Sequence, residues 1–150
     1  LIYVLIYYIQ AYYIEVLDME DMFNKDITVI NQYIDESHKK VYKVSYLKGF
    51  WSSNDGISIN GTQLTKNDGL SARILINDNR NEEYQKPEEF RKKQKTWTLQ
   101  NDDYLIKGKV ENFTTISKLL NDYQEVIKIT NIAIKDYGSE DMWHFYVTGA

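Results

Sequence analysis

Residues 27–47 read ITVINQYIDESHKKVYKVSYL, and they carry the strongest structural signal in the chain. Residues 27–34 and 41–47 are rich in Ile, Val, Thr and Tyr, which favour β-strands. The polar residues 35–39 between them suit a tight turn. The pattern predicts an antiparallel hairpin, and its second strand continues through a bulge at 49–51.

The rest of the chain repeats this alternation of short apolar segments and polar links. Within residues 53–69, three turn-forming sequences end in glycine, and a turn is expected at each of them. They are Asn54-Asp55-Gly56, Asn60-Gly61 and Asn67-Asp68-Gly69. Further strands are predicted at 70–76, 104–110, 126–134 and 142–148. The third of these has a break in its alternation near Asn131, and in the second Gly108 leaves room for a close approach.

Helical character is confined to two segments. Residues 114–123 have apolar side chains at the spacing of one helix face, with Thr114 or Thr115 as the cap. That face consists of Ile116, Leu119, Leu120 and Tyr123. The polar residues 77–95 predict either a long loop or a loop with a short helix after Pro87.

Roughly six strands with hairpin-length links and one firm helix predict a mainly β (α+β) fold. We expect a small antiparallel barrel or sandwich of about six strands with one packed helix, formed as a single β-rich domain by residues 22–150. Residues 1–21 begin LIYVLIYYIQAYYIEVL and are interpreted as an apolar extension outside the fold, a strand or a buried helix. Gln10 and Glu15 interrupt them, so a membrane anchor is disfavoured.

Composition and charge exclude several classes of protein. The chain has no cysteine, which rules out disulfides and thiolate chemistry. Four of the 22 acidic residues lie in residues 1–21, which hold no base, so 18 acidic and 18 basic residues remain in 22–150. This balance argues against nucleic-acid binding driven by bulk charge.

Catalytic and metal-binding patterns are missing from the sequence. His38 and His144 are far apart and stand in no metal-ligand spacing. Asp102 and Asp103 are adjacent, and adjacent side chains of a strand point to opposite faces, so they make a poor acid/base pair. No nucleophile elbow, phosphate loop or dinucleotide fingerprint occurs. We therefore expect a protein that is not an enzyme and has no catalytic residue, cofactor or metal.

Aromatic residues and one basic run are the candidates for a binding surface. The aromatic content is 14%, with 13 tyrosines, and Tyr and Trp concentrate at contact centres. The run at 91–95 is either a solvated polar face or an electrostatic contact with an acidic subunit or nucleic acid. The candidate interface residues are Trp51, Phe90, Arg91, Lys92, Lys93, Lys95, Trp97, Tyr104, Trp143 and Tyr146.

Three segments carry a likeness to a known family. The first is TWTLQNDDYLIKGKV at 96–110, which follows Pro87-Glu88-Glu89-Phe90. The others are 136–149 near the end of the chain and 26–31 with 47–51 near its start. Together they resemble a family of small uncharacterised proteins from the morphogenesis genes of phages and prophages of Gram-positive bacteria. The likeness spans roughly 22–149 and departs from the family at Gln100-Asn101-Asp102, where Pro-Gly-Asp is usual.

The resemblance implies a virion component of the head–tail connector, head-closure or minor capsid type. Its partners would be other phage structural subunits and further copies of itself in a ring, and the 77–95 loop would reach a partner subunit or the packaged DNA. It would reside in the virion and, during assembly, in the host cytoplasm, with no membrane contact expected. The alternative hypothesis is a ligand- or glycan-binding β module that stacks its ligand on Trp51 or Trp97.

Overall fold

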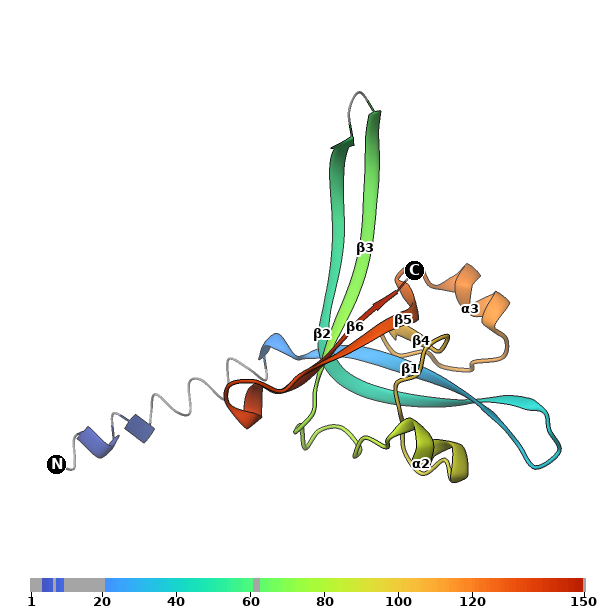
Figure 1. Cartoon of the computed structure of the whole chain (residues 1–150), viewed down its shortest axis with the longest axis horizontal. Coiled ribbons are helices and arrows are strands. Elements are labelled where there is room, and N and C mark those ends of the chain that lie inside the picture. Colours follow the sequence, from blue (N-terminus) through green and yellow to red (C-terminus); the bar gives the residue numbers. More distant parts are fainter. Residues whose placement is uncertain (1–3, 7, 10–20, 61–62, 150) are drawn as a thin grey trace.

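The computed structural model describes residues 4–6, 8–9, 21–60 and 63–149, and for 54–60 and 63–68 it describes the backbone. From Lys25 onward, six strands and three short helices follow one another (Figure 1). Their order is β1(Lys25–Ile34), β2(Lys40–Asn60), β3(Gln63–Leu75), α2(Pro87–Lys92), β4(Tyr104–Lys107), α3(Ile116–Asp122), β5(Val126–Lys135), η1(Glu140–Met142) and β6(His144–Gly149).

The six strands form a closed antiparallel barrel in the order β1-β2-β3-β6-β5-β4. The predicted hairpin at 27–47 is its first unit, since β1 and β2 pair from Ile34↔Lys40 to Lys25↔Gly49. β4 then closes the barrel by pairing with β1 on one side and β5 on the other. The expected fold class is therefore confirmed, in its barrel form.

Two strands, β2 and β5, change their pairing partner along their length, and a glycine lies at each point of change. β2 pairs with β1 up to Gly49 and with β3 from Phe50 onward, so it changes partners where a bulge was expected. A Cβ on Gly49 would lie 2.7 Å from Ile27 Cδ1 and 2.8 Å from the Arg73 carbonyl oxygen. Only glycine permits so close an approach of two strands.

β5 makes the second transition, with the break in alternation predicted near Asn131. It pairs with β4 through residues 126–128 and with β6 from Ile129, with a register shift between Ile129 and Asn131. Its partner at the shift is Gly149, where a Cβ would collide with the carbonyl group of Lys128. Strands that pass from one side of a sheet structure to another commonly do so at such bends and bulges.

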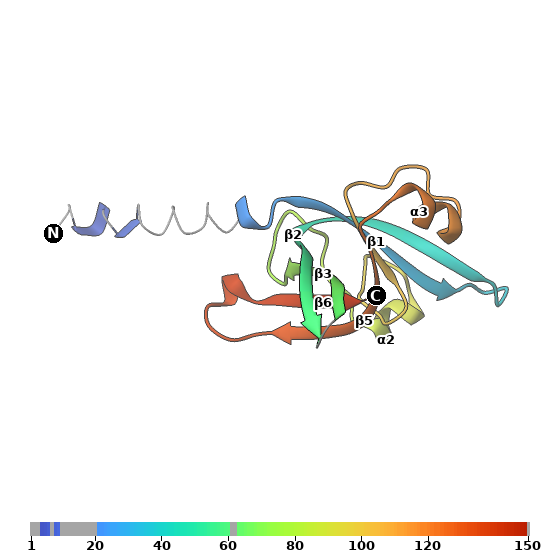
Figure 2. The same ribbon diagram turned by 90° about the horizontal axis from the view of Figure 1, so that it is seen from above.

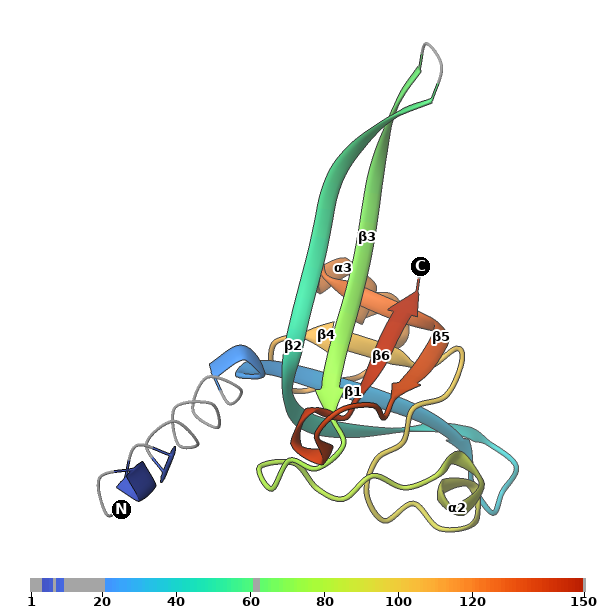
Figure 3. The ribbon, with the colours of Figure 1, turned by 60° about the vertical axis from the view of Figure 1, so that its left-hand side comes forward.

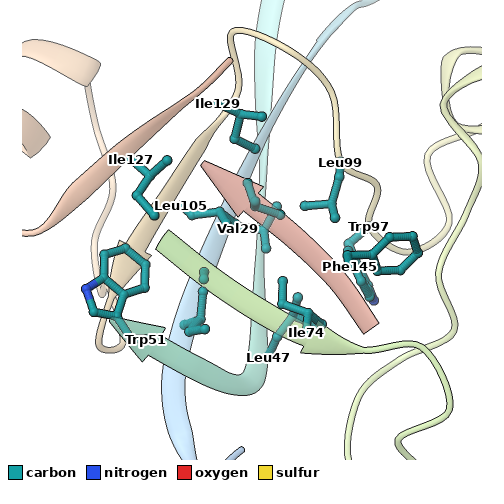
Figure 4. Close-up of a cluster of buried hydrophobic side chains, with 13 residues drawn as sticks. Val29, Leu47, Trp51, Ile74, Trp97, Leu99, Leu105, Ile127, Ile129 and Phe145 are labelled. Carbon is teal, nitrogen blue, oxygen red and sulfur yellow. The ribbon is translucent and has the colours of Figure 1, made fainter. Parts of the chain in front are cut away.

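Apolar side chains from all six strands fill the barrel interior (Figure 4). Val29 and Ile74 are fully buried there, and Trp51 closes one side of the cluster. A second cluster lies outside the barrel wall, where α3 covers Ile30 and Ile106 with Leu119. Thr115 caps α3 by accepting a hydrogen bond from the Lys118 backbone N–H at 3.2 Å. Leu120, predicted on the buried face, is exposed.

A two-stranded arm projects from the barrel where β2 and β3 continue past their other partners (Figures 1 and 3). Their pairing runs without a shift from Phe50↔Arg73 to Asn60↔Gln63. Two of the three predicted turns are therefore wrong, because 54–56 and 67–69 lie within paired strands and pair with each other. The third, Asn60-Gly61, falls where the strands reverse, and Gly61 is outside the described residues. We call residues 54–60 with 63–69 the arm.

The long polar segment at 77–95 contains the short helix expected after Pro87 and is tied to the barrel by hydrogen bonds. The Asn81 side chain accepts from the Lys48 backbone N–H at 2.7 Å and donates to the Lys48 carbonyl at 3.0 Å. The expected strand at 104–110 is shorter than predicted and ends at Lys107. Gly108 adopts φ +100° with open space beside it, so it serves a bend and not a close approach.

The predicted extension at 1–21 lies largely outside the described residues. Its described parts, residues 4–6, 8–9 and 21, are helical and exposed, and residues 4–6 and 8–9 lie well away from the barrel (Figure 2). None of the helices in the described part of the chain combines the length and apolar character needed to cross a bilayer.

Replacing Gly49 by alanine is expected to lower the free energy of unfolding by about 1–3 kcal/mol, because the methyl group would overpack the transition of β2. The matched control is Lys48→Ala next to it, which removes an exposed ion pair with Asp26 and should cost at most about 1 kcal/mol. Urea denaturation of both variants measures the difference. An unchanged stability of Gly49→Ala would show that the close approach is not a constraint.

Candidate interaction surface

The arm has two backbone edges that pair with no further strand in the part of the chain that the structure describes. β3 gains its second partner, β6, only at Leu70↔Gly149, so residues 63–69 pair on one side alone. On β2, pairing with β1 stops at Gly49, so residues 54–60 also have one free edge. The seven residue pairs of the arm, from Asn54↔Gly69 to Asn60↔Gln63, span roughly 20 Å at the rise of a strand. Isolated two-stranded ribbons are marginally stable in water, so such an arm is typical of a segment that packs on a partner.

At the base of the arm, the outer face of the barrel carries two rows of side chains that run across the strands. One row is polar and the other is aromatic around a single arginine, and both follow directly from the pairing registers. The polar row is Ser52, Ser71, Thr148 and Asn131, and the other is Phe50, Arg73, Tyr146 and Ala133. A surface hollow of about 520 Å³ lies over this region.

Arg73 is the only charged residue in these rows. Its guanidinium carbon lies 5.7 Å from the ring centre of Phe50 and 5.1 Å from that of Tyr146, so two rings hold it by cation–π contacts. The side chain is exposed, and it makes no ion pair with any side chain that the structure describes. An arginine held in place without an acidic partner leaves its planar set of donors available to a carboxylate. We call this region, Phe50, Ser52, Ser71, Arg73, Tyr146 and Thr148, the base face.

A buried polar network lies within the segment that carried the family resemblance. Asp103 is 3% exposed and accepts three hydrogen bonds, from Asn31 Nδ2 at 2.9 Å, Gln100 Nε2 at 2.9 Å and the Gln32 backbone N–H at 3.1 Å. Asn31 also donates to the Thr98 carbonyl and accepts from the Thr98 backbone N–H. The network therefore joins β1 to residues 98–103, which otherwise have no strand of their own.

Burial raises the pKa of Asp103 above its ordinary value, and the nearby Asp102 adds to this effect. The hydrogen bonds from Asn31, Gln100 and Gln32 oppose the shift only in part. Asp102 itself is exposed and has φ +73°. The two carboxylates thus differ in environment: Asp102 is an exposed turn residue and Asp103 is a buried hydrogen-bond acceptor.

Three of the predicted interface residues belong to the core, which corrects that part of the prediction. Trp51 is 8% exposed, Trp97 is 2% exposed and Phe90 is fully buried. Trp97 packs against Tyr84 and Phe145 and donates to the Glu82 carbonyl at 2.7 Å. Because these rings are needed to fix the barrel and the 77–95 segment, a glycan could not stack on Trp51 or Trp97 at the surface.

The three other predicted aromatics are half-buried and lie apart from one another. Tyr104 packs on the cluster beneath α3, and Trp143 follows η1, where its indole N–H donates to the Gly138 carbonyl. Tyr146 is the one that belongs to the base face, against Arg73. The structure therefore does not join the three into a single aromatic surface.

The four basic residues of the predicted run are exposed at and just after the end of α2. They are Arg91, Lys92, Lys93 and Lys95, and none forms an ion pair with a described side chain. Arg91 also borders a hollow of about 400 Å³ with Gln100, Asn101 and Asn131. This surface fits a solvated polar face as well as an acidic partner.

The residues of the base face other than Tyr146 are absent from the sequence prediction. The signal for Arg73 was present, because the strand at 70–76 places Leu70, Ala72 and Ile74 on one face and therefore Arg73 on the other. What the sequence could not supply is the register, since Phe50 and Tyr146 reach Arg73 only through pairing with β2 and β6.

Among the residues that the structure describes, no group of three or more His, Cys, Asp or Glu side chains could hold a metal ion. Comparison with known proteins identifies the family of the chain. Residues 22–150 match DUF6751, a family of unknown function, and the chain belongs to it. No curated protein and no solved structure matches the chain.

Replacing Asp103 by asparagine should lower the free energy of unfolding at neutral pH by about 1–3 kcal/mol, because an amide group would turn a donor toward Asn31 and Gln100. Asp102→Asn is the matched control, since Asp102 is exposed and asparagine tolerates its positive φ. Urea denaturation at neutral pH should show a loss for the first variant and almost none for the second. Equal effects would contradict the role given to the network.

The raised pKa of Asp103 also predicts the pH dependence of this difference. The folded chain binds the proton more tightly than the unfolded chain, so Asp103 contributes stability below its ordinary pKa that is lost as the pH rises through the folded value. The free energy of unfolding of the wild type minus that of Asp103→Asn should therefore fall as the pH increases from about 4 toward about 7. A difference that rises with pH would contradict the direction of the shift.

Proposed function

We propose that this protein is a structural subunit of a larger assembly, and that the arm makes its main contact with a neighbouring subunit. The observation that carries the proposal is the arm itself, a ribbon that projects from the closed barrel and whose two backbone edges pair with no third strand among the described residues. Closed barrels avoid edge-to-edge association, so an arm that restores two edges fits a protein that needs a specific partner.

The setting that we propose is a phage or prophage particle, as a head–tail connector, head-closure or minor capsid component. The resemblance of residues 87–110 and 136–149 to proteins of phage morphogenesis genes supports it. In this role the protein works by protein–protein assembly without catalysis, in the host cytoplasm during assembly and then in the virion. The exposed cations at 91–95 offer a contact with an acidic subunit or with packaged DNA.

Shortening the arm should abolish assembly and leave the barrel folded. Deleting residues 55–60 and 63–68 keeps Gly61-Thr62 as the link and closes the hairpin at the pair Asn54↔Gly69. Because antiparallel pairs alternate in type, removing six residues from each strand preserves the type of the closing pair. Light scattering after size exclusion should show an oligomer for the wild type and a monomer for the deletion.

The control for this deletion is the double variant Glu36→Ala, Lys39→Ala in the turn of the other long hairpin, which should assemble as the wild type does. Circular dichroism and thermal melting should show a folded barrel in both variants. A shortened protein that assembles like the wild type would overturn the role of the arm.

The phage setting has its own test. Particles released after prophage induction, purified by density gradient and analysed by mass spectrometry, should contain the protein at a fixed copy number. A protein that is expressed in the host but absent from the particles would contradict the proposal.

A further inference from the structure

We propose that the base face is the acceptor for the arm of a second copy of this chain, with Arg73 meeting the carboxylates of Asp55 and Asp68. This inference rests on the proposed function, since it requires the arm to make a subunit contact. It goes further by naming the occupant, the surface that receives it and the faces of the ribbon that meet.

The acceptor side is a fixed cation that has no acidic partner among the described side chains. Phe50 and Tyr146 hold the Arg73 guanidinium by cation–π contacts at 5.7 and 5.1 Å, and no described carboxylate pairs with it. The hydroxyl groups of Ser52, Ser71 and Thr148 run beside it in the next row. The hollow of about 520 Å³ over these rows leaves room for an incoming segment.

The donor side is a pair of like charges. The register places Asp55 directly opposite Asp68, and like charges in opposed positions of an antiparallel pair are destabilising. Lys66 lies two positions from Asp68 and supplies the one base beside these two acids, so an excess of negative charge remains. A cation supplied from outside the arm relieves the repulsion, and the unpaired Arg73 of a second copy is such a cation.

The strand alternation decides the geometry of the contact. Trp51 and Ala72 are buried, so the face of β2 and β3 that includes them points into the barrel, and Asp55 and Asp68 fall on its continuation along the arm. Arg73 belongs to the opposite, outer face. One copy must therefore present one face of its ribbon to the other face of its neighbour. Such a contact is either repeated head to tail, which generates a closed ring or a filament, or exchanged reciprocally in a two-fold dimer.

Apolar positions on the arm continue the same face beyond the acidic pair. The register places Ile57 opposite Lys66 and Ile59 opposite Leu64, in phase with Asp55. Burial of apolar positions supplies most of the affinity of a contact, whereas an exposed ion pair adds little and mainly fixes partner and orientation. Exchanging the charges of Arg73, Asp55 and Asp68 therefore tests the contact without removing its apolar part.

The test compares three charge variants of the full chain by light scattering after size exclusion over a range of concentrations. Arg73→Glu alone should lose the oligomer, and so should Asp55→Lys with Asp68→Lys. The variant that combines all three substitutions restores opposite charges across the contact and should recover it. Mixing the first two variants should also recover oligomers, because each then meets a complementary surface.

Lys118→Glu is the matched control, since it reverses an exposed cation on α3, outside both the base face and the cations at 91–95, and should assemble as the wild type does. Thermal melting of every variant separates loss of assembly from loss of folding. Variants that all assemble like the wild type, or a folded triple variant that stays monomeric, would overturn the pairing of Arg73 with the arm.

The outcomes also separate this inference from the proposed function. If the shortened arm is monomeric and the charge variants all assemble, the arm binds elsewhere, so this inference fails and the proposed function stands. If the wild type stays monomeric at every concentration, a second copy is not the occupant. The content of purified particles then decides whether the protein is a structural subunit at all.

Discussion

The barrel depends on two places where neighbouring strands come closer than any side chain would allow. At Gly49, β2 leaves β1 and takes β3 as its partner, with the Arg73 carbonyl 2.8 Å from where a Cβ would lie. At Gly149, β6 meets the register shift of β5 in the same manner. These two transitions let four long strands and two shorter ones, β4 and β6, close on themselves. The continuation of β2 past Gly49 is also what creates the arm, so fold and interaction surface share one cause.

Closure alone does not hold the segment between β3 and β4, which has 28 residues and little regular structure. Trp97 and Phe90 fix it through rings, and Asp103 fixes it through hydrogen bonds to Asn31 and Gln100. Buried polar groups are costly unless each is satisfied, so the network favours one arrangement of this segment over others. Phe90 and Trp97, predicted as surface aromatics, and Asp103, predicted as a turn residue, therefore hold this segment from within the core.

Local sequence patterns predicted most of the helices, strands and turns, but few of the contacts between residues far apart in the sequence. The hairpin at 27–47, the cap at Thr115, the helix after Pro87 and the break near Asn131 each rest on residues close in sequence, and all are present. The turns at 54–56 and 67–69 failed because two Asn-Asp-Gly sequences pair with each other, and cross-strand pairing overrides turn preference. Burial of Trp97 and the grouping of Phe50, Arg73 and Tyr146 depend on registers that no local pattern contains.

The composition of the arm limits non-specific pairing at its free edges. An exposed strand edge of high β-propensity is a template for indiscriminate pairing, and natural proteins limit that risk with charges and with residues that favour strands poorly. Both strands of the arm contain Asn-Asp-Gly, and the opposed Asp55 and Asp68 add like charges at its base. Such a ribbon therefore has little tendency to pair with the edges of unrelated sheets. A partner that offers a matched cation, beside a surface able to cover Ile57 and Ile59, removes the penalty, so the same residues that limit aggregation make the contact selective.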